Sequence, residues 1–315
     1  MQVSSKPAAS LVAACPPGSR ILFVSPHFDD VAFSCAGLVH HLVSTCETRV
    51  VWATVFSHGR PRPQGFALRC QTTKGIPREV DYMAIRRQED RNCGVLLKIE
   101  EAINLGFLEA PHRGYRSAKK LFGPLLRHDE QRLLRAVGQA LARLACDLSA
   151  YRVIAPLGLG GHVDHVLVSR AAEMAFAPAR LLYYADSPYL LRCSRSDLRS
   201  RTLGMTAHVL DVGAVSAERA AAYACYASQL DYQLRDIGNV HDLAQSSARH
   251  AGDLCRSRHD VEIYLRRWPP RRHPVGVFAR SCRGTGFRVL TPKKGAADIE
   301  AVNASPEKVI LRVTG

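Results

Sequence analysis

The chain has 315 residues, 47 % of them hydrophobic, and a formal net charge of +15 at pH 7. A chain of this length can bury a substantial core, so a small scaffold held together by disulfide bonds is excluded. Its ten cysteines form no C-x-x-C pair and its basic residues are not interleaved with aromatic ones, so we expect neither a zinc ribbon nor a nucleic-acid partner. The scattered cysteines favour a reducing compartment, and the charge equally suits a small anionic substrate.

Residues 1–19 are interpreted as a disordered leader. They carry one lysine, Lys6, and a short apolar stretch that ends at Cys15. Because Val-Ala-Ala precedes this cysteine, a very short lipoprotein signal with a lipid anchor on Cys15 is the alternative. No run of ~18 uninterrupted apolar residues occurs in the chain. We therefore expect no membrane span and a cytoplasmic protein.

From Arg20 onward, short apolar runs alternate with segments of helical periodicity. The predicted strands cover residues 21–24, 49–56, 102–107, 151–156 and 180–185. The predicted helices cover residues 35–43, 82–97, 129–146, 164–176 and 216–234, and residues 57–80 read as a long loop. This alternation predicts an α/β protein, a Rossmann-like three-layer fold with a mostly parallel sheet.

We expect one main domain, which covers residues 20–235. Residues 236–315 are predicted to form a C-terminal extension packed on the same domain. The extension contains a further helical stretch before Leu265 and then short strand-like pieces, which fall at residues 275–279, 287–290 and 309–313.

Two unusual peptides follow two of the predicted strands. Residues 25–30 read Ser-Pro-His-Phe-Asp-Asp, and residues 158–165 read Gly-Leu-Gly-Gly-His-Val-Asp-His. In open α/β sheets, ligands bind where the carboxyl ends of the strands meet the loops that follow. Each peptide places imidazole and carboxylate groups in that position, which predicts that the two peptides form one site.

The residue types suit a catalytic zinc ion (Zn2+), which takes three nitrogen or carboxylate ligands and keeps an open position for water. We expect His27, Asp30 and His165 to be these ligands. Bound zinc lowers the pKa of water to about 7. Asp29 adjoins a ligand but projects to another side, so we expect it to be the general base that activates the zinc-bound water.

The second peptide offers two further candidates. His162 lies three residues before His165, so both imidazoles face the same pocket if the turn between them is helical. In its charged form His162 can stabilise the oxyanion of the transition state or protonate the leaving amine. Asp164 is placed to orient one of the imidazoles, as carboxylates beside metal ligands commonly do.

These residues resemble the signature of the PIG-L/LmbE-like zinc N-deacetylases, which act on N-acetylglucosaminyl conjugates. The matching motifs are Pro26-His27-Phe28-Asp29-Asp30 and His162-Val163-Asp164-His165. The resemblance extends to Arg86-Arg87-Gln88-Glu89, Leu105-Gly106-Phe107 and Tyr184-Ala185-Asp186-Ser187-Pro188-Tyr189, and it covers roughly residues 20–235.

The resemblance implies the same roles for the matching residues. It implies zinc ligation by His27, Asp30 and His165, base catalysis by Asp29, transition-state assistance by His162 and substrate binding by Arg86. A salt bridge between Arg86 and Glu89 is the alternative for that arginine. Some members of the family carry a mobile tyrosine in the glycine loop before the second motif, and residues 157–161 hold none.

The motifs and the resemblance together predict a zinc-dependent hydrolase that removes an N-acyl group, with acetyl expected, from an amino-sugar conjugate. Anionic and lipid-linked conjugates are among the expected substrates. Two alternatives stay open: a zinc amidase that acts on a thiol conjugate or another amide, and a non-catalytic module on the same fold that binds sugar or nucleic acid.

Overall fold

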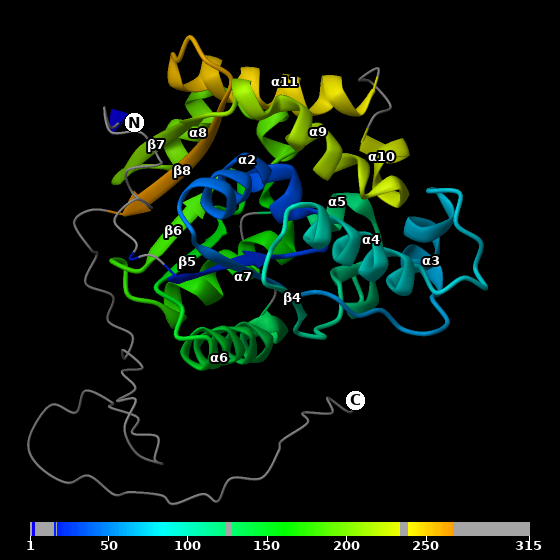
Figure 1. The fold of residues 1–315 in the computed structure, drawn as a ribbon. Coiled ribbons are helices and arrows are strands. Elements are labelled where there is room, and N and C mark those ends of the chain that lie inside the picture. The colour runs from blue at the N-terminus through cyan, green and yellow to red at the C-terminus, as the bar shows by residue number, and fades with distance from the viewer. Residues whose placement is uncertain (1, 4–15, 17, 124–127, 234–238, 268–315) are drawn as a thin grey trace, which may run out of the picture. The chain divides into compact units, whose positions relative to one another are not determined.

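The computed structural model describes residues 2–3, 16, 18–123, 128–233 and 239–267. Most of the predicted leader and all three strand-like pieces of the predicted extension lie outside these ranges. Within them, a central sheet is covered by helices on both faces (Figure 1). The predicted three-layer α/β fold is confirmed.

The strands lie side by side in the order β1-β7-β8-β6-β5-β2-β3-β4. They are β1 (Gln2–Val3), β2 (Arg20–Ser25), β3 (Arg49–Thr54), β4 (Glu101–Asn104), β5 (Arg152–Pro156), β6 (Leu181–Tyr184), β7 (Met205–Asp211) and β8 (Val261–Arg267). All neighbouring pairs in this order are parallel except the two that involve β8. The mostly parallel sheet that the sequence predicted is therefore present.

Strand β2 shows why both faces of the sheet are covered. Ile21 and Phe23 pack into a core with α2, α9 and α11, whereas Leu22 and Val24 pack into a second core with α6 and α7. Successive side chains of a strand point to opposite faces, so a continuous apolar run supplies both cores at once. The helices are α2 (Asp30–Thr45), α3 (Gly65–Thr72), α4 (Tyr82–Leu96), α5 (Ala118–Leu121), α6 (Gln131–Asp147), α7 (Val163–Ala175), α8 (Arg195–Arg201), α9 (Ser216–Ala224), α10 (Ala227–Gln233) and α11 (Val240–Cys255).

The chain beyond residue 200 departs most from the prediction. The helix predicted at 216–234 is two helices, α9 and α10. The expected helix before Leu265 is α11, but it is followed by strand β8, which lies in the sheet between β6 and β7. A buried glutamate, Glu262, interrupts the apolar run of β8, and this obscured the strand. In the loop predicted at 57–80, residues 65–72 form the short helix α3.

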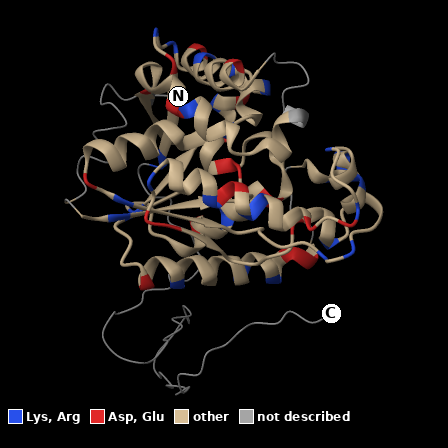
Figure 2. Cartoon of the chain, turned by 45° about the vertical axis from the view of Figure 1, so that its right-hand side comes forward, with Lys and Arg blue, Asp and Glu red and all other residues tan. Residues whose placement is uncertain are grey.

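Charged residues are distributed over several layers of this fold. Figure 2 shows Lys and Arg on helices and loops in many parts of the view, interspersed with Asp and Glu. Within the described residues, positive charge thus comes from many separate positions.

No helix in the described part of the chain is long and apolar enough to cross a membrane.

Candidate active site

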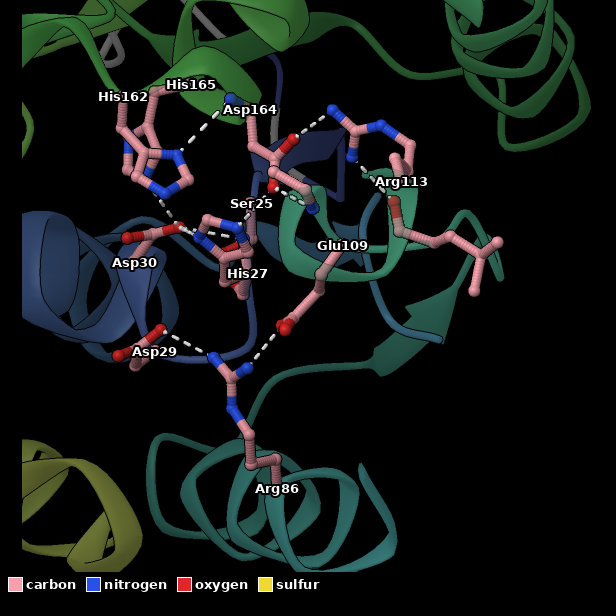
Figure 3. A network of polar contacts seen from close by, with 12 residues as sticks. Ser25, His27, Asp29, Asp30, Arg86, Glu109, Arg113, His162, Asp164 and His165 are labelled. Atoms are coloured by element: carbon pink, nitrogen blue, oxygen red, sulfur yellow. Dashed lines mark hydrogen bonds and ion pairs between the residues drawn. The ribbon is translucent and has the colours of Figure 1, made fainter. Parts of the chain in front are cut away.

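The two sequence motifs meet because their strands are neighbours. Strand β2 ends at Ser25 and strand β5 ends at Pro156, and the two strands pair in parallel. Their carboxyl ends therefore lie at the same edge of the sheet. The potential ligand atoms of His27, Asp30 and His165 all lie within 4.8 Å of one another, and Figure 3 shows these side chains converging from the two motifs.

The first motif is shaped by the start of helix α2. Asp29 is the residue before the helix and Asp30 is its first residue. The backbone N–H of His27 donates to Asp30 Oδ2 at 2.7 Å, and the N–H of Val31 donates to Ser25 Oγ at 3.2 Å. A carboxylate in the first turn of a helix is also stabilised by the helix dipole. The loop thus holds the Asp30 carboxylate at one fixed position.

The three predicted ligands have the spacing of a tetrahedral metal site. His27 Nδ1 lies 3.2 Å from Asp30 Oδ2, and His165 Nε2 lies 3.3 Å from the same oxygen. Ligand atoms of a tetrahedral zinc with bonds of about 2.0–2.1 Å stand about 3.3 Å apart. The Nε2 atom of His165 is buried and has no hydrogen-bond partner among the described residues. An unsatisfied buried ring nitrogen beside a carboxylate fits a bound cation.

The predicted ligands His27, Asp30 and His165 are called the ligand set below. In each of its two imidazoles, the ring nitrogen that faces away from Asp30 contacts another carboxylate. His27 Nε2 lies 3.0 Å from Asp164 Oδ2, and His165 Nδ1 lies 2.7 Å from Asp186 Oδ1. A histidine that donates one ring N–H to a carboxylate presents its other nitrogen, unprotonated, to a metal. Asp164 was predicted to orient an imidazole, and the structure places it behind His27. Asp186 appeared in the sequence only as part of a resembling stretch without a role.

The carboxylates around the imidazoles favour positive charge. Burial lowers the pKa of His27, but its hydrogen bonds to Asp164 and Asp30 outweigh burial and raise this pKa to about 9. Burial likewise opposes the charged form of His165, whose pKa is nevertheless raised to about 10 by Asp30 and Asp186. A pocket that stabilises an extra proton so strongly also suits a metal cation in its place.

His162 lies beside the ligand set. It precedes helix α7, and its Nδ1 accepts a hydrogen bond from the N–H of Asp164 at 3.3 Å. Its ring centroid is 5.1 Å from that of His27 and 5.4 Å from that of His165. Burial lowers the pKa of His162 to about 3, so the ring is neutral at pH 7 and the charged form expected from the sequence is not the one present. With Nδ1 used as an acceptor, the remaining N–H is Nε2–H, which is free to serve as a donor.

His162 and Asp164 also form a second possible ligand group with His27. In that group, however, both oxygens of Asp164 are already engaged. Its Oδ2 accepts from the Ala110 N–H at 3.0 Å, and its Oδ1 lies 2.7 Å from Arg113 Nη2. The set of His27, Asp30 and His165 is therefore the better cation site.

The predicted base lies against the predicted substrate-binding arginine. Asp29 Oδ1 is 3.4 Å from Arg86 Nη2, and Arg86 Nη1 donates to Glu109. Arg86 rises from α4 toward both carboxylates (Figure 3) and is only 5 % exposed. The alternative partner Glu89 accepts instead from the N–H and the hydroxyl of Ser228, each at 2.7 Å. The alternative prediction of a salt bridge between Arg86 and Glu89 is therefore wrong. Substrate binding by Arg86 stays a prediction.

A loop that the sequence left unassigned supports the site from outside. Arg113 contacts Asp164 and also Glu130 Oε1 at 2.8 Å, and Glu130 Oε2 accepts from Tyr115 Oη at 2.7 Å. The chain of contacts thus runs from His27 through Asp164 to the loop around residue 113. The one signal in the sequence was the cluster of charged residues there, which has no periodicity from which such contacts can be predicted.

The glycine loop before the second motif follows a path that requires glycine. Gly160 has φ +73°, in the left-handed region, and a Cβ built on it would lie 2.8 Å from an atom of the Tyr189 ring. The loop is therefore packed directly against Tyr189, and only glycine fits at this position.

Known proteins are similar to this chain in sequence and in fold. The family model described as GlcNAc-PI de-N-acetylase, which defines the PIG-L family, matches residues 22–176. The chain is 33 % identical over 226 residues to a 2'-N-acetylparomamine deacetylase of Streptomyces fradiae. This match covers 67 % of this chain and 74 % of that protein. A 2'-N-acetylparomamine deacetylase of Niallia circulans is 29 % identical over 187 residues, or 53 % of this chain and 66 % of that one.

A solved structure agrees with the fold. The zinc-inhibited form of a teicoplanin deacetylase matches with a TM-score of 0.67 at 20 % sequence identity, over 78 % of this chain and 97 % of that one. At this identity the match shows the fold alone, whereas the relative from Streptomyces fradiae shows the family. The chain belongs to the PIG-L family of de-N-acetylases.

Proposed function

We propose that this protein is a zinc-dependent N-deacetylase that removes an acetyl group from an amino-sugar conjugate. The observation that carries the proposal is the pair of imidazoles that converge on Asp30, each backed by its own carboxylate. Family membership supports the reaction class. The two relatives named 2'-N-acetylparomamine deacetylases support a small aminoglycoside as the substrate.

In the proposed site, His27 Nδ1, Asp30 and His165 Nε2 hold the zinc ion. When bound there, zinc acidifies water and polarises the amide carbonyl. Asp164 and Asp186 keep the ligand imidazoles in the right tautomer. These assignments follow from which ring nitrogens the two carboxylates occupy.

Asp29 and His162 carry the proton and charge transfers in the proposed mechanism. Asp29 takes a proton from the attacking water while the water oxygen bonds to the acyl carbon. His162 Nε2–H donates to the developing oxyanion. The carbon–nitrogen bond then breaks, and the proton held by Asp29 passes to the leaving nitrogen, which gives a free amine and acetic acid.

Arg86 is proposed to serve this chemistry from behind Asp29. It lies between Asp29 and Glu109 and over the rings of Phe28 and Tyr82, at 5.4 and 5.5 Å from their centroids. These contacts support a role in holding the base, in addition to the predicted contact with substrate.

The test combines elemental analysis of zinc with amine release by wild type and Asp29→Asn. The panel holds 2'-N-acetylparomamine, neutral and anionic N-acetylglucosamine conjugates, and an N-acetylated thiol conjugate. We expect about one zinc per chain in both proteins, and a loss of turnover of about 10²–10⁴-fold in Asp29→Asn, because only the base is removed.

Each other outcome has a definite meaning. Release from the thiol conjugate alone would replace the sugar deacetylase with the amidase alternative. A wild-type protein that takes up no zinc would support the non-catalytic module. Full activity of Asp29→Asn would contradict the role of Asp29 as base.

A further inference from the structure

We infer that Phe122 is the aromatic surface on which the sugar ring of the substrate lies, next to the catalytic His162. This inference rests on the proposed function and specifies how the substrate is recognised. Among the large hydrophobic side chains of the described residues, Phe122 is one of the few left exposed, at 43 %. Its ring centroid lies 5.5 Å from that of His162, with the two planes at 82°.

Phe122 belongs to a small aromatic wall made with Tyr189 and His162. The rings of Phe122 and Tyr189 are 6.0 Å apart, and the ring of Tyr189 is 5.0 Å from that of His165. Tyr189 is the inner part of the wall beside a predicted zinc ligand. Phe122 is the outer part, so a substrate whose amide reaches the ligand set meets Phe122 with its ring.

The position of Phe122 relative to the site is held by backbone contacts. Phe122 forms an antiparallel bridge with His162, and the N–H of Gly123 donates to the carbonyl oxygen of Gly161 at 2.9 Å. Tyr189 is packed against Gly160 on the inner side. A backbone held in this way needs little reordering when the ring binds a ligand, which favours affinity.

The chemistry of a pyranose ring fits such a wall. Its C–H face is apolar and its hydroxyl groups lie around the edge, so it can cover an aromatic face while its hydroxyls stay in water. Binding sites for small ligands commonly combine apolar or aromatic walls with a few placed polar groups. An acyl amide without a ring has no group to cover Phe122. The residue should therefore determine preference for cyclic amino sugars.

The experiment compares Phe122→Ala and Phe122→Trp with wild type. The control is Leu203→Ala, because Leu203 is 74 % exposed and lies at the amino end of β7, the sheet edge opposite the site. The substrates are an N-acetylglucosaminide and the ring-free amide N-acetyl-2-aminoethanol. For Phe122→Ala we expect the KM of the sugar to rise about tenfold, the kcat to stay within about twofold, and both constants of the ring-free amide to stay unchanged.

The rescue variant and the control separate recognition from structural damage. Phe122→Trp should keep the wild-type KM for the sugar because it restores an aromatic face, and Leu203→Ala should behave as wild type throughout. All variants should hold the wild-type amount of zinc. An unchanged sugar KM in Phe122→Ala, or an equal rise for the ring-free amide, would overturn the inference.

A binding measurement distinguishes failure of this inference from failure of the proposed function. Saturation-transfer difference NMR of N-acetylglucosamine on Asp29→Asn, with and without Phe122→Ala, reads the contact without turnover. If wild type releases no amine but the signal of the sugar C–H protons depends on Phe122, the reaction is wrong and the sugar contact stands. If that signal is absent or independent of Phe122, the contact is refuted even where the enzyme is active.

Discussion

Two buried polar clusters in this fold, one around Glu262 in the core and one around Asp30 at the site, differ in whether all of their polar atoms have hydrogen-bond partners. Glu262 Oε1 accepts from the N–H of Gly37 and from Arg219 Nε, at 2.8 and 3.0 Å. Its Oε2 accepts from the N–H of Leu38 and from Tyr264 Oη, at 3.0 and 2.7 Å. Four donors saturate this carboxylate. Beside Asp30, by contrast, the buried Nε2 of His165 has no hydrogen bond from any described residue.

The difference distinguishes a structural cluster from the proposed metal site. A buried polar group without a hydrogen bond costs about 1–3 kcal/mol unless a ligand or water satisfies it, so such an atom within a cluster of potential ligands fits a bound cation. Both clusters are equally buried and charged, so burial and charge alone do not identify the site. What distinguishes the site is that its unsatisfied nitrogen, His165 Nε2, belongs to a group of three potential metal ligands.

The largest effect should come from removing that nitrogen. In His165→Ala, zinc content should fall from about one per chain to near zero, because two ligands are too few for a stable site. Elemental analysis after dialysis measures this, with circular dichroism to check the fold. Zinc at the wild-type level in the variant would show that the metal sits elsewhere.

Breaking the saturated cluster should affect stability and leave the metal alone. Arg219→Met leaves Glu262 buried without its charged partner, which should lower the free energy of unfolding by about 3–5 kcal/mol. Urea unfolding measures the loss. Chelator competition should give a zinc dissociation constant within about twofold of wild type, and a larger change would mean that the two clusters are coupled.

Asp90 is a third buried carboxylate, with two side-chain donors, and its contribution to the free energy of unfolding depends on pH. It accepts from Tyr226 Oη at 2.9 Å and Trp52 Nε1 at 3.2 Å, and burial raises its pKa from the ordinary 3.8 to about 7. Between these values the unfolded chain has lost a proton that the folded chain keeps. The free energy of unfolding should therefore fall as pH rises from about 4 to about 7, by on the order of 4 kcal/mol, and then level off.

Urea unfolding at pH 5 and pH 8 tests this for wild type and Asp90→Asn. The asparagine variant cannot ionise, so its stability should depend less on pH in this range. Equal pH dependence in both proteins would show that Asp90 titrates near its ordinary value.

The smallest effect should come from the outer support of the site. Arg113→Met removes the charged contact that holds Asp164 behind His27, and zinc affinity should fall roughly 10–100-fold. Arg219→Met is the matched control, since it also removes a buried arginine from an ion pair. Arg113→Lys should recover part of the affinity, and equal zinc affinities for the two methionine variants would contradict the support role.

The sequence predicted the parts of the molecule whose pattern is local. The apolar runs of β2 and β5 placed their strands, and motifs directly after those strands brought His27, Asp30 and His165 together. Strand β8 was missed because its register with β6 and β7 allows a buried glutamate, Glu262, in mid-strand. That arrangement depends on donors from α2 and α9, far away in the chain.

The supporting residues could not be predicted for the same reason. Glu89 is the local partner for Arg86 on a helix, yet Glu109 and Asp29 hold that arginine in the structure. Arg113 and Asp186 contact residues that are distant in the chain. Arg113 lies 51 residues before its partner Asp164, and Asp186 lies 21 residues after its partner His165. The positions of charged residues in the sequence do not indicate which of them meet across such separations.

The loop that carries Arg113 also carries Phe122, and this limits how the enzyme can be re-engineered. Replacing the whole loop with that of a relative, to change the accepted sugar, would also remove the group that steadies Asp164 behind His27. A graft confined to residues 117–123 would change the aromatic wall and leave Arg113 and Tyr115 in place. If the proposed roles of Phe122 and Asp164 hold, substrate range and metal retention should be separable within this segment by an exchange that begins after residue 116.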